Sequence, residues 1–228
     1  AELARHFAEA APIIGPEKQI HYSVLAGEHA LSTYAYEEAL QHYQTAFDIK
    51  SAQTSLSNAT RIDDTMQIDQ QTADILFGLG RSQRATATYQ MHEAWLSLSK
   101  AFDYNVEAGD IPQVVDVAEH LPVTEHLRTT EMIAQALTLV PADSHYEGRL
   151  LSRYGNALNF EKGDYKSARD AFDRALSIAQ REGDVNLEMR TMVYVACLSG
   201  EYQQLEDTLA KSLRTVQLAR HEPNPQVE

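Results

Sequence analysis

Apolar residues recur at intervals of three and four positions along most of this chain, with polar residues between them. Two stripes show the pattern clearly: Leu150, Leu151, Tyr154 and Leu158, and then Ala168, Ala171, Phe172, Ala175 and Ile178. This interval places apolar side chains on one face of an α-helix, whereas a half-buried strand would alternate every second residue. No segment of the sequence shows convincing alternation. The pattern therefore predicts an all-α protein.

Turn residues divide this pattern into separate helices. Gly109-Asp110, Gly163-Asp164 and Gly183-Asp184 each predict the end of one helix followed by the cap of the next. Gly200-Glu201 predicts the same kind of turn with a poorer cap. The predicted helices span residues 2–11, 17–33, 36–50, 68–86, 90–108, 112–121, 125–139, 144–161, 165–181, 185–199 and 202–219.

A second pattern repeats within these helices. A small or apolar residue is followed four positions later by a large one, and three positions after that by another small one. The four copies are Ala39, Tyr43 and Ala46; Ala94, Leu98 and Ala101; Ala168, Phe172 and Ala175; and Leu205, Leu209 and Ser212. This spacing is typical of the second helix of a tetratricopeptide-type (TPR) repeat.

The helix before each of three copies carries a glycine at a matching distance. Gly27 precedes Ala39 by twelve residues, Gly155 precedes the alanine of its copy by thirteen, and Gly80 precedes that of its copy by fourteen. Small residues at these places allow two helices to pack backbone to backbone, while the large residue fills the space beside them. The sequence therefore predicts the contact that holds each helix pair together.

Together these features predict a right-handed superhelix of about five TPR-like helix pairs. One interval between copies, 74 residues, is close to two periods, so helices 112–121 and 125–139 should form a pair without the signature. The predicted organisation is an N-terminal linker helix at 1–16, a repeat domain at 17–220 with a polar insertion at about 51–66, and a disordered tail at 221–228.

Beyond the repeats, the segments 2–12, 21–47, 77–83 and 148–184 resemble the C-terminal repeat region of large bacterial signal-transduction ATPases of the maltose-activator type. The resemblance implies that a nucleotide-binding module precedes such an array and that a LuxR-type DNA-binding domain often follows it. This chain would then be the sensing or scaffolding part of a cytoplasmic regulator.

Motifs for chemistry are absent from the sequence. It contains no phosphate-binding G-x4-G-K-[ST] loop and no helix-turn-helix with a basic reading helix. Its nine histidines lack a second metal ligand at helical spacing, and Asp143-Ser144 next to His145 suits a helix cap better than a catalytic triad. Cys197, on an apolar helix, is expected to be a buried structural thiol. We therefore expect a protein that is not an enzyme and needs no metal or cofactor.

Net charge and hydropathy limit the classes of partner that this chain can bind. A net charge of −14 makes direct nucleic-acid binding by this segment improbable, since that binding needs a broad basic surface. No apolar run is long enough for a transmembrane helix, and the start of the chain lacks a signal-peptide pattern. A single cysteine is compatible with a reducing compartment. These features favour a cytoplasmic protein without a membrane partner.

One set of polar residues is a candidate binding site. In a TPR array the first helix of each pair lines the concave surface, and residues at i, i+3, i+7 and i+10 on that face would project into one groove. The predicted groove residues are Arg81, Arg84, Arg149, Asn156, Asn159, Arg190 and Tyr194. Guanidinium and amide groups suit carboxylates, phosphates and peptide backbone. The alternative is that these arginines form ion pairs with neighbouring acidic helices.

The sequence thus predicts a non-catalytic sensor or interaction module that binds a protein, a peptide or a small anionic effector on its concave face. Two alternatives stay open: an assembly scaffold that forms homo-oligomers and binds no small molecule, and an enzyme whose catalytic geometry is not visible in the sequence. A bound small molecule would favour the sensor, and a large apolar contact between two copies would favour the scaffold.

Overall fold

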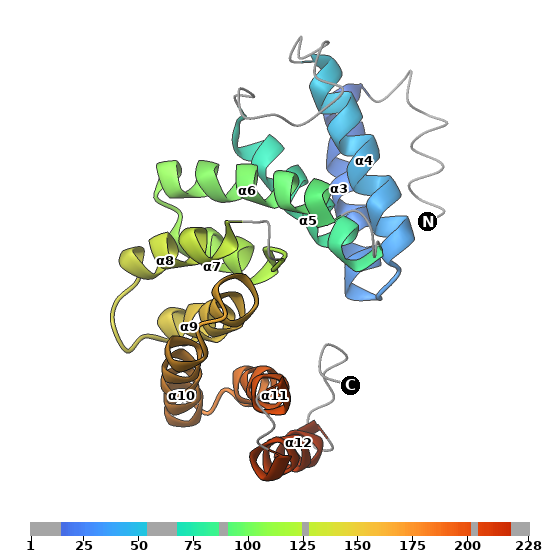
Figure 1. The fold of residues 1–228 in the computed structure, drawn as a ribbon. Helices are drawn as coiled ribbons and strands as arrows, with labels where there is room; N and C mark the ends of the chain where they lie inside the picture. The colour runs from blue at the N-terminus through green and yellow to red at the C-terminus, as the bar shows by residue number, and fades with distance from the viewer. Residues whose placement is uncertain (1–14, 54–67, 87–90, 125–127, 202–204, 220–228) are drawn as a thin grey trace. The chain divides into compact units, whose positions relative to one another are not determined.

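The computed structural model describes residues 15–53, 68–86, 91–124, 128–201 and 205–219. These residues form ten α-helices and one short π-helix, with no strand among them (Figure 1). The helices are α3 (Pro16–Ser32), α4 (Tyr36–Gln53), α5 (Gln70–Thr86), α6 (Met91–Ala108), α7 (Ile111–His120), α8 (Thr129–Leu139), α9 (His145–Ala157), the π-helix η1 (Leu158–Lys162), α10 (Tyr165–Glu182), α11 (Val185–Glu201) and α12 (Leu205–Ala219). The all-α prediction is confirmed for this part of the chain. The predicted helix 2–11, most of the loop 51–66 and the tail 221–228 lie outside it.

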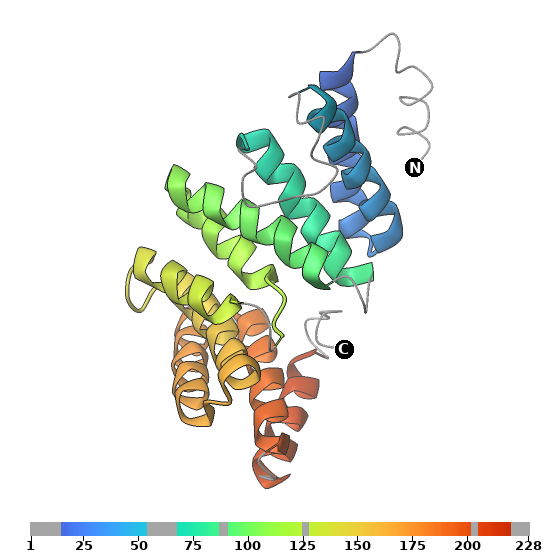
Figure 2. The same cartoon turned by 45° about the horizontal axis from the view of Figure 1, so that its top comes forward.

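The helices belong to two compact units. One unit comprises Ala1–Gln113 with His120–Pro122, and the other comprises Val114–Glu119 with Val123–Glu228. In the first unit α3 packs on α4, α4 on α5, and α5 on α6. In the second unit α8 packs on α9, and α9, α10, α11 and α12 follow one another in the same way (Figures 1 and 2). Within each of these two series, helices that are consecutive in the sequence are therefore neighbours in space. None of the described helices is long and apolar enough to cross a membrane.

The three predicted Gly-Asp boundaries are confirmed. The backbone is left-handed at each glycine, with φ of 72° at Gly109, 63° at Gly163 and 69° at Gly183, a conformation that glycine adopts without steric cost. The aspartate that follows caps the next helix, because its carboxylate accepts a hydrogen bond from the backbone N–H three residues ahead. Each Gly-Asp pair thus ends one helix and begins another.

Two predicted boundaries are wrong, and a tertiary contact explains the second. The turn at Gly200-Glu201 does not form, because α11 continues to Glu201. Helix α8 begins at Thr129 and not at 125. Its first N–H groups donate to the carboxylate of Glu161 at 3.1 and 2.9 Å, so residues distant in sequence supply this cap.

The predicted contact between small and large residues is confirmed in three helix pairs. A Cβ atom added to Gly155 would lie 2.7 Å from the ring of Phe172 and 2.9 Å from the carbonyl oxygen of Ala168. A Cβ added to Gly80 would lie 2.5 Å from Leu98 and 3.2 Å from the carbonyl oxygen of Ala94. A Cβ atom at distances under 3.0 Å would force a neighbour to shift, and 3.2 Å is tighter than most Cβ contacts, so each glycine allows the backbones of its pair to approach closely.

In the first unit the large residue, Tyr43, serves two neighbouring helices. A Cβ added to Gly27 on α3 would lie 2.7 Å from the Tyr43 ring, and one added to Gly78 on α5 would lie 2.1 Å from it. Tyr43 is only 2% exposed. Burial, together with the nearby Glu28 carboxylate, raises the pKa of its hydroxyl to about 12. One aromatic ring therefore joins α3, α4 and α5.

Replacing Gly155 with alanine tests this contact. Glycine-to-alanine changes inside helices ordinarily stabilise a protein by about 0.5–1 kcal/mol, because alanine restricts the unfolded chain. Here we expect the free energy of unfolding to fall by about 1–3 kcal/mol, since the added methyl group meets a carbonyl oxygen that cannot move freely. Urea denaturation followed by circular dichroism measures the change. A stabilised Gly155→Ala protein would show that the helix packing is wrong.

Replacing Ala168 with leucine tests the same contact from the other helix. Ala168 is fully buried, so we expect a loss of about 1–3 kcal/mol in the free energy of unfolding. Ala108→Leu is the matched control, because Ala108 is an exposed residue of α6. The control should melt within a few degrees of the parent, and equal melting of both variants would contradict the assigned packing.

Candidate functional site

A cluster of charged side chains joins α7, α9 and α11 in the second unit. Arg149 on α9 donates hydrogen bonds to two carboxylates of α7, Asp116 at 2.6 Å and Glu119. Arg190 on α11 donates to the other oxygen of Glu119 at 2.5 Å. Because Glu119 accepts from both arginines, a single carboxylate connects three helices. We call Asp116, Glu119, Arg149 and Arg190 the charge cluster.

Helical spacing explains how this cluster forms. Asp116 and Glu119 are three residues apart on α7 and therefore lie on one face of the helix. Arg149 lies between the buried Gly148 and Leu150, yet its guanidinium remains about one-fifth exposed. The side chain of Glu119 is only 6% exposed, and its buried negative charge is paired with both arginines.

A second arginine of α9 lies deeper. Arg153 is 3% exposed, and its guanidinium donates a hydrogen bond of 2.9 Å to the hydroxyl of Tyr194 on α11. The same guanidinium lies 5.9 Å from the centre of the Tyr194 ring, within the range of a cation–π interaction. The Tyr194 ring also stacks on the ring of Phe172, with 6.2 Å between the ring centres. Tyr194 therefore connects the polar face to the apolar core of the second unit.

The charge states in the cluster follow from these contacts. Burial by itself would lower the pKa of Arg149, but the hydrogen bonds and negative charges of Glu119 and Asp116 raise it above its ordinary value. Arg149 therefore stays protonated at every accessible pH. The two arginine charges are balanced by two carboxylate charges, so this part of the face is close to neutral.

The predicted groove residues have different outcomes in the structure. Arg149 and Arg190 form ion pairs with α7, which was the alternative to a ligand site, and their positive charge is offset. Asn156, half-buried, lies on α9 two turns after Arg149, and its side chain makes no hydrogen bond to any described residue. Asn159 lies in η1, where the wider π-helical turn changes the phase that the prediction assumed.

Arg81 and Arg84 lie in the first unit, on α5. The guanidinium of Arg81 lies over the ring of Phe77 at 5.3 Å. Arg84 donates a hydrogen bond of 3.3 Å to the carbonyl oxygen of His120, whose ring meets Phe77 edge-on at 5.5 Å. A groove shared by all seven predicted residues stays a prediction, because these two arginines and the other five residues belong to different units.

Sequence reasoning missed three members of this face, Asp116, Glu119 and Arg153. Asp116 and Glu119 belong to the predicted helix pair that lacks the repeat signature, so no signature residue indicates which side of this helix faces the groove. Applying the same helical phase to residues 112–121 would have found them, since they are separated by one turn. Arg153 could not be found in this way, because an arginine four residues after another gives no sign of being buried.

The other chemical candidates have structural roles or different surroundings. Ser144 caps α9 by accepting a hydrogen bond from the backbone N–H of Glu147, as the sequence predicted. Cys197 is exposed, so the prediction of a buried thiol is wrong: it lies one turn after Tyr194, beside the core-facing side of α11. Within the described residues, no three His, Cys, Asp or Glu side chains are grouped as metal ligands would be.

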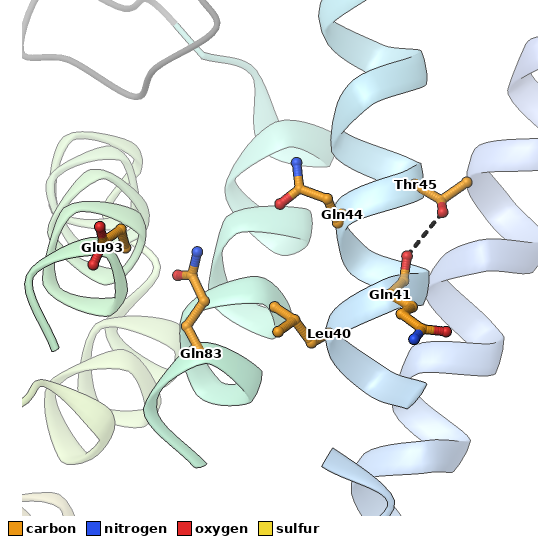
Figure 3. A pocket seen from close by; sticks show the side chains of 6 residues that line it. All are labelled: Leu40, Gln41, Gln44, Thr45, Gln83 and Glu93. Atoms are coloured by element: carbon orange, nitrogen blue, oxygen red, sulfur yellow. Dashed lines mark hydrogen bonds between the residues drawn. The ribbon is translucent and has the colours of Figure 1, made fainter. Parts of the chain in front are cut away.

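A pocket of about 610 Å³ lies in the first unit (Figure 3). It is lined by Leu40, Gln41, Gln44, Thr45, Gln83 and Glu93, from α4, α5 and α6. None of the predicted groove residues lines it. No pattern along the chain indicates this pocket, because it depends on how three helices pack.

Comparison with known protein families found no family model that matches this chain. A search among characterised proteins likewise found no significant match.

Replacing Glu119 with glutamine tests the charge cluster. The substitution leaves two neighbouring guanidinium groups without their shared carboxylate, so we expect the free energy of unfolding to fall by about 1–3 kcal/mol. Asp116→Asn is the control, because Asp116 is 39% exposed and its ion pair with Arg149 is screened by solvent, so its loss should cost under about 1 kcal/mol. Urea denaturation at low and high salt measures both variants. Equal effects would show that Glu119 does not hold the three helices together.

Proposed function

We propose that this chain is a non-catalytic, TPR-like interaction module of a larger bacterial signalling or transcription regulator. It binds a protein or peptide partner through the polar face of α7, α9 and α11. The observation that supports this most is the charge cluster, which holds three helices in one arrangement through the buried Glu119. A face whose side chains are already fixed loses little conformational freedom when a partner binds.

The repeat architecture is part of the same proposal. A glycine packs against a large residue in three helix pairs, and consecutive helices are neighbours from α3 to α6 and from α8 to α12. Both features are expected of TPR-like pairs stacked in a right-handed superhelix, in which first helices line the concave side. Such surfaces typically bind extended partners, because each repeat offers a few side chains along the groove.

The electrostatics favour a protein or peptide over a small anion. Arg149 and Arg190 already donate to Asp116 and Glu119, so an anion would have to compete with carboxylates that are fixed in place. A peptide can instead use the remaining features of the face. Asn156 can donate to and accept from peptide backbone. Phe160, which follows in η1, is 48% exposed and can serve as an apolar anchor.

Peptide selection tests this function. Random twelve-residue peptides displayed on phage would be selected on the whole chain, and the affinity of the selected peptides measured by fluorescence polarisation. We expect Asn156→Ala to weaken binding about three- to tenfold, as the loss of one or two hydrogen bonds would, and Phe160→Ala to weaken it about tenfold or more. Neither change should lower the melting temperature much, since both side chains are partly exposed.

The matched control is Gln180→Ala, which removes an exposed amide side chain from α10. It should leave the affinity unchanged. Selected peptides that bind all variants equally would contradict the proposed face, and so would a selection that enriches no peptide.

Helix α12 supports a second candidate function, that of an assembly scaffold. Leu209, Leu213 and Val216 lie on consecutive turns of this helix and are 60%, 55% and 52% exposed. Apolar side chains at this spacing form a stripe that a helix usually covers with another element. An oligomer built through α12 would bury the stripe.

Light scattering after size-exclusion chromatography decides between the two functions. If the scaffold is right, the chain should have at least twice the monomer mass, and Leu213→Ser should return it to the monomer. Leu139→Ser, on α8 and 37% exposed, is the control and should not change the mass. A protein that is still a monomer at about 100 µM would contradict the scaffold function, and the interaction module would be the remaining candidate.

A further inference from the structure

The pocket of the first unit differs from the proposed face in both place and chemistry. It lies between α4 and α6, with α5 as its floor, and Figure 3 shows the six side chains around the space. Three of them are glutamines: Gln41, Gln44 and Gln83. A pocket of about 610 Å³ has the size of ordinary ligand sites.

The floor of the pocket carries an amide with a fixed orientation. Gln83 is 9% exposed, and its Oε1 accepts a hydrogen bond of 2.9 Å from the hydroxyl of Ser97, which is fully buried. Because the oxygen is used in this way, Nε2 is the group that remains to donate. No described residue accepts from it. Figure 3 shows this amide in the space between Glu93 and Gln44.

The wall on α4 carries the complementary group. The Nε2 of Gln44 donates a hydrogen bond of 2.9 Å to Asp48, so its Oε1 remains to accept. In Figure 3 this oxygen lies on the side of Gln44 that faces Gln83. The pocket thus presents one donor and one acceptor, each held by a partner outside the pocket. A secondary amide, such as a peptide bond, needs this combination.

The opposite wall adds a charge. Glu93 is an exposed residue of α6, and its carboxylate forms no ion pair with any described residue. Beside the glutamines, Leu40 supplies an apolar surface. A basic side chain can therefore pair with Glu93 while its backbone meets the two amides. The hydroxyl of Thr45 does not compete, since it donates to the carbonyl oxygen of Gln41 (Figure 3).

We propose that this pocket binds an extended peptide segment carrying a lysine or arginine. The peptide backbone hydrogen-bonds to Gln83 and Gln44, and the basic side chain pairs with Glu93. The site is independent of the polar face on α7, α9 and α11, because it uses no residue of that face. Under this proposal the chain has two separate places at which a peptide can bind.

Nuclear magnetic resonance on the whole chain tests the site with a defined probe. The probe is acetyl-Gly-Gly-Arg-Gly-Gly-amide, which offers peptide backbone and one basic side chain and nothing else. The comparison peptide carries glutamate in place of arginine. We expect saturable shifts of the Gln83 and Gln44 side-chain amide signals with the arginine peptide, and binding at least about threefold weaker with the glutamate peptide.

Variants at the edge of the pocket make the test specific. Gln44→Ala and Glu93→Gln should each weaken binding of the arginine peptide about three- to tenfold, with the fold intact because both side chains are exposed. The matched controls Gln180→Ala and Glu107→Gln change exposed residues elsewhere and should have no effect.

Three results would overturn the proposal: no saturable shift with the arginine peptide, equal binding of the arginine and glutamate peptides, or equal binding by Gln44→Ala, Glu93→Gln and the parent. Asn156→Ala and Phe160→Ala should leave this binding unchanged. Failure of this site is therefore distinguishable from failure of the polar face.

Discussion

The fold depends on the close approach of two helix backbones where a glycine of one meets a large side chain of the other. At Gly155 and Phe172, and again at Gly80 and Leu98, no side chain atom would fit at the glycine. This contact fixes how near the helices come and how each is rotated about its axis, because the large residue must point at the glycine. Once that rotation is fixed, the outward faces are fixed as well. The positions of the binding residues therefore follow from a packing constraint that involves none of them.

Local chemistry made much of the fold predictable from the sequence. The Gly-Asp boundaries depend on one glycine conformation and one short hydrogen bond, so neighbouring residues suffice to recognise them. The helix contact was predictable because glycine and its large partner recur at a nearly constant spacing. The start of α8 was not, since its cap comes from Glu161, a residue distant in the sequence. The turn predicted at Gly200 was wrong as well, because α11 continues through this glycine to Glu201.

The helical positions of the candidate site residues were predictable, but the neutralisation of their charges was not. Helical spacing placed Arg149 and Arg190 on neighbouring faces. Whether their charges are available to a ligand depends on carboxylates of α7. Glu119, which pairs with both, is 30 residues from Arg149 and 71 residues from Arg190 in the sequence. The prediction that Cys197 is buried was wrong for a related reason. Apolar neighbours in the sequence do not show on which side of the helix the thiol lies. The orientation of the Gln83 amide is set by Ser97 on another helix, so no pattern along the chain could reveal it.

The carboxylate of Glu161 also has a consequence for the order in which the protein can be built. The ribosome completes α8 before it adds Glu161, which follows Thr130 by 31 positions. Until then the first turn of α8 must leave its N–H groups to water. An isolated helix of eleven residues is marginal in water, and α8 can gain this cap only after η1, which carries Glu161, has been added. A nascent chain that ends before Glu161 therefore lacks the group that caps the first turn of α8.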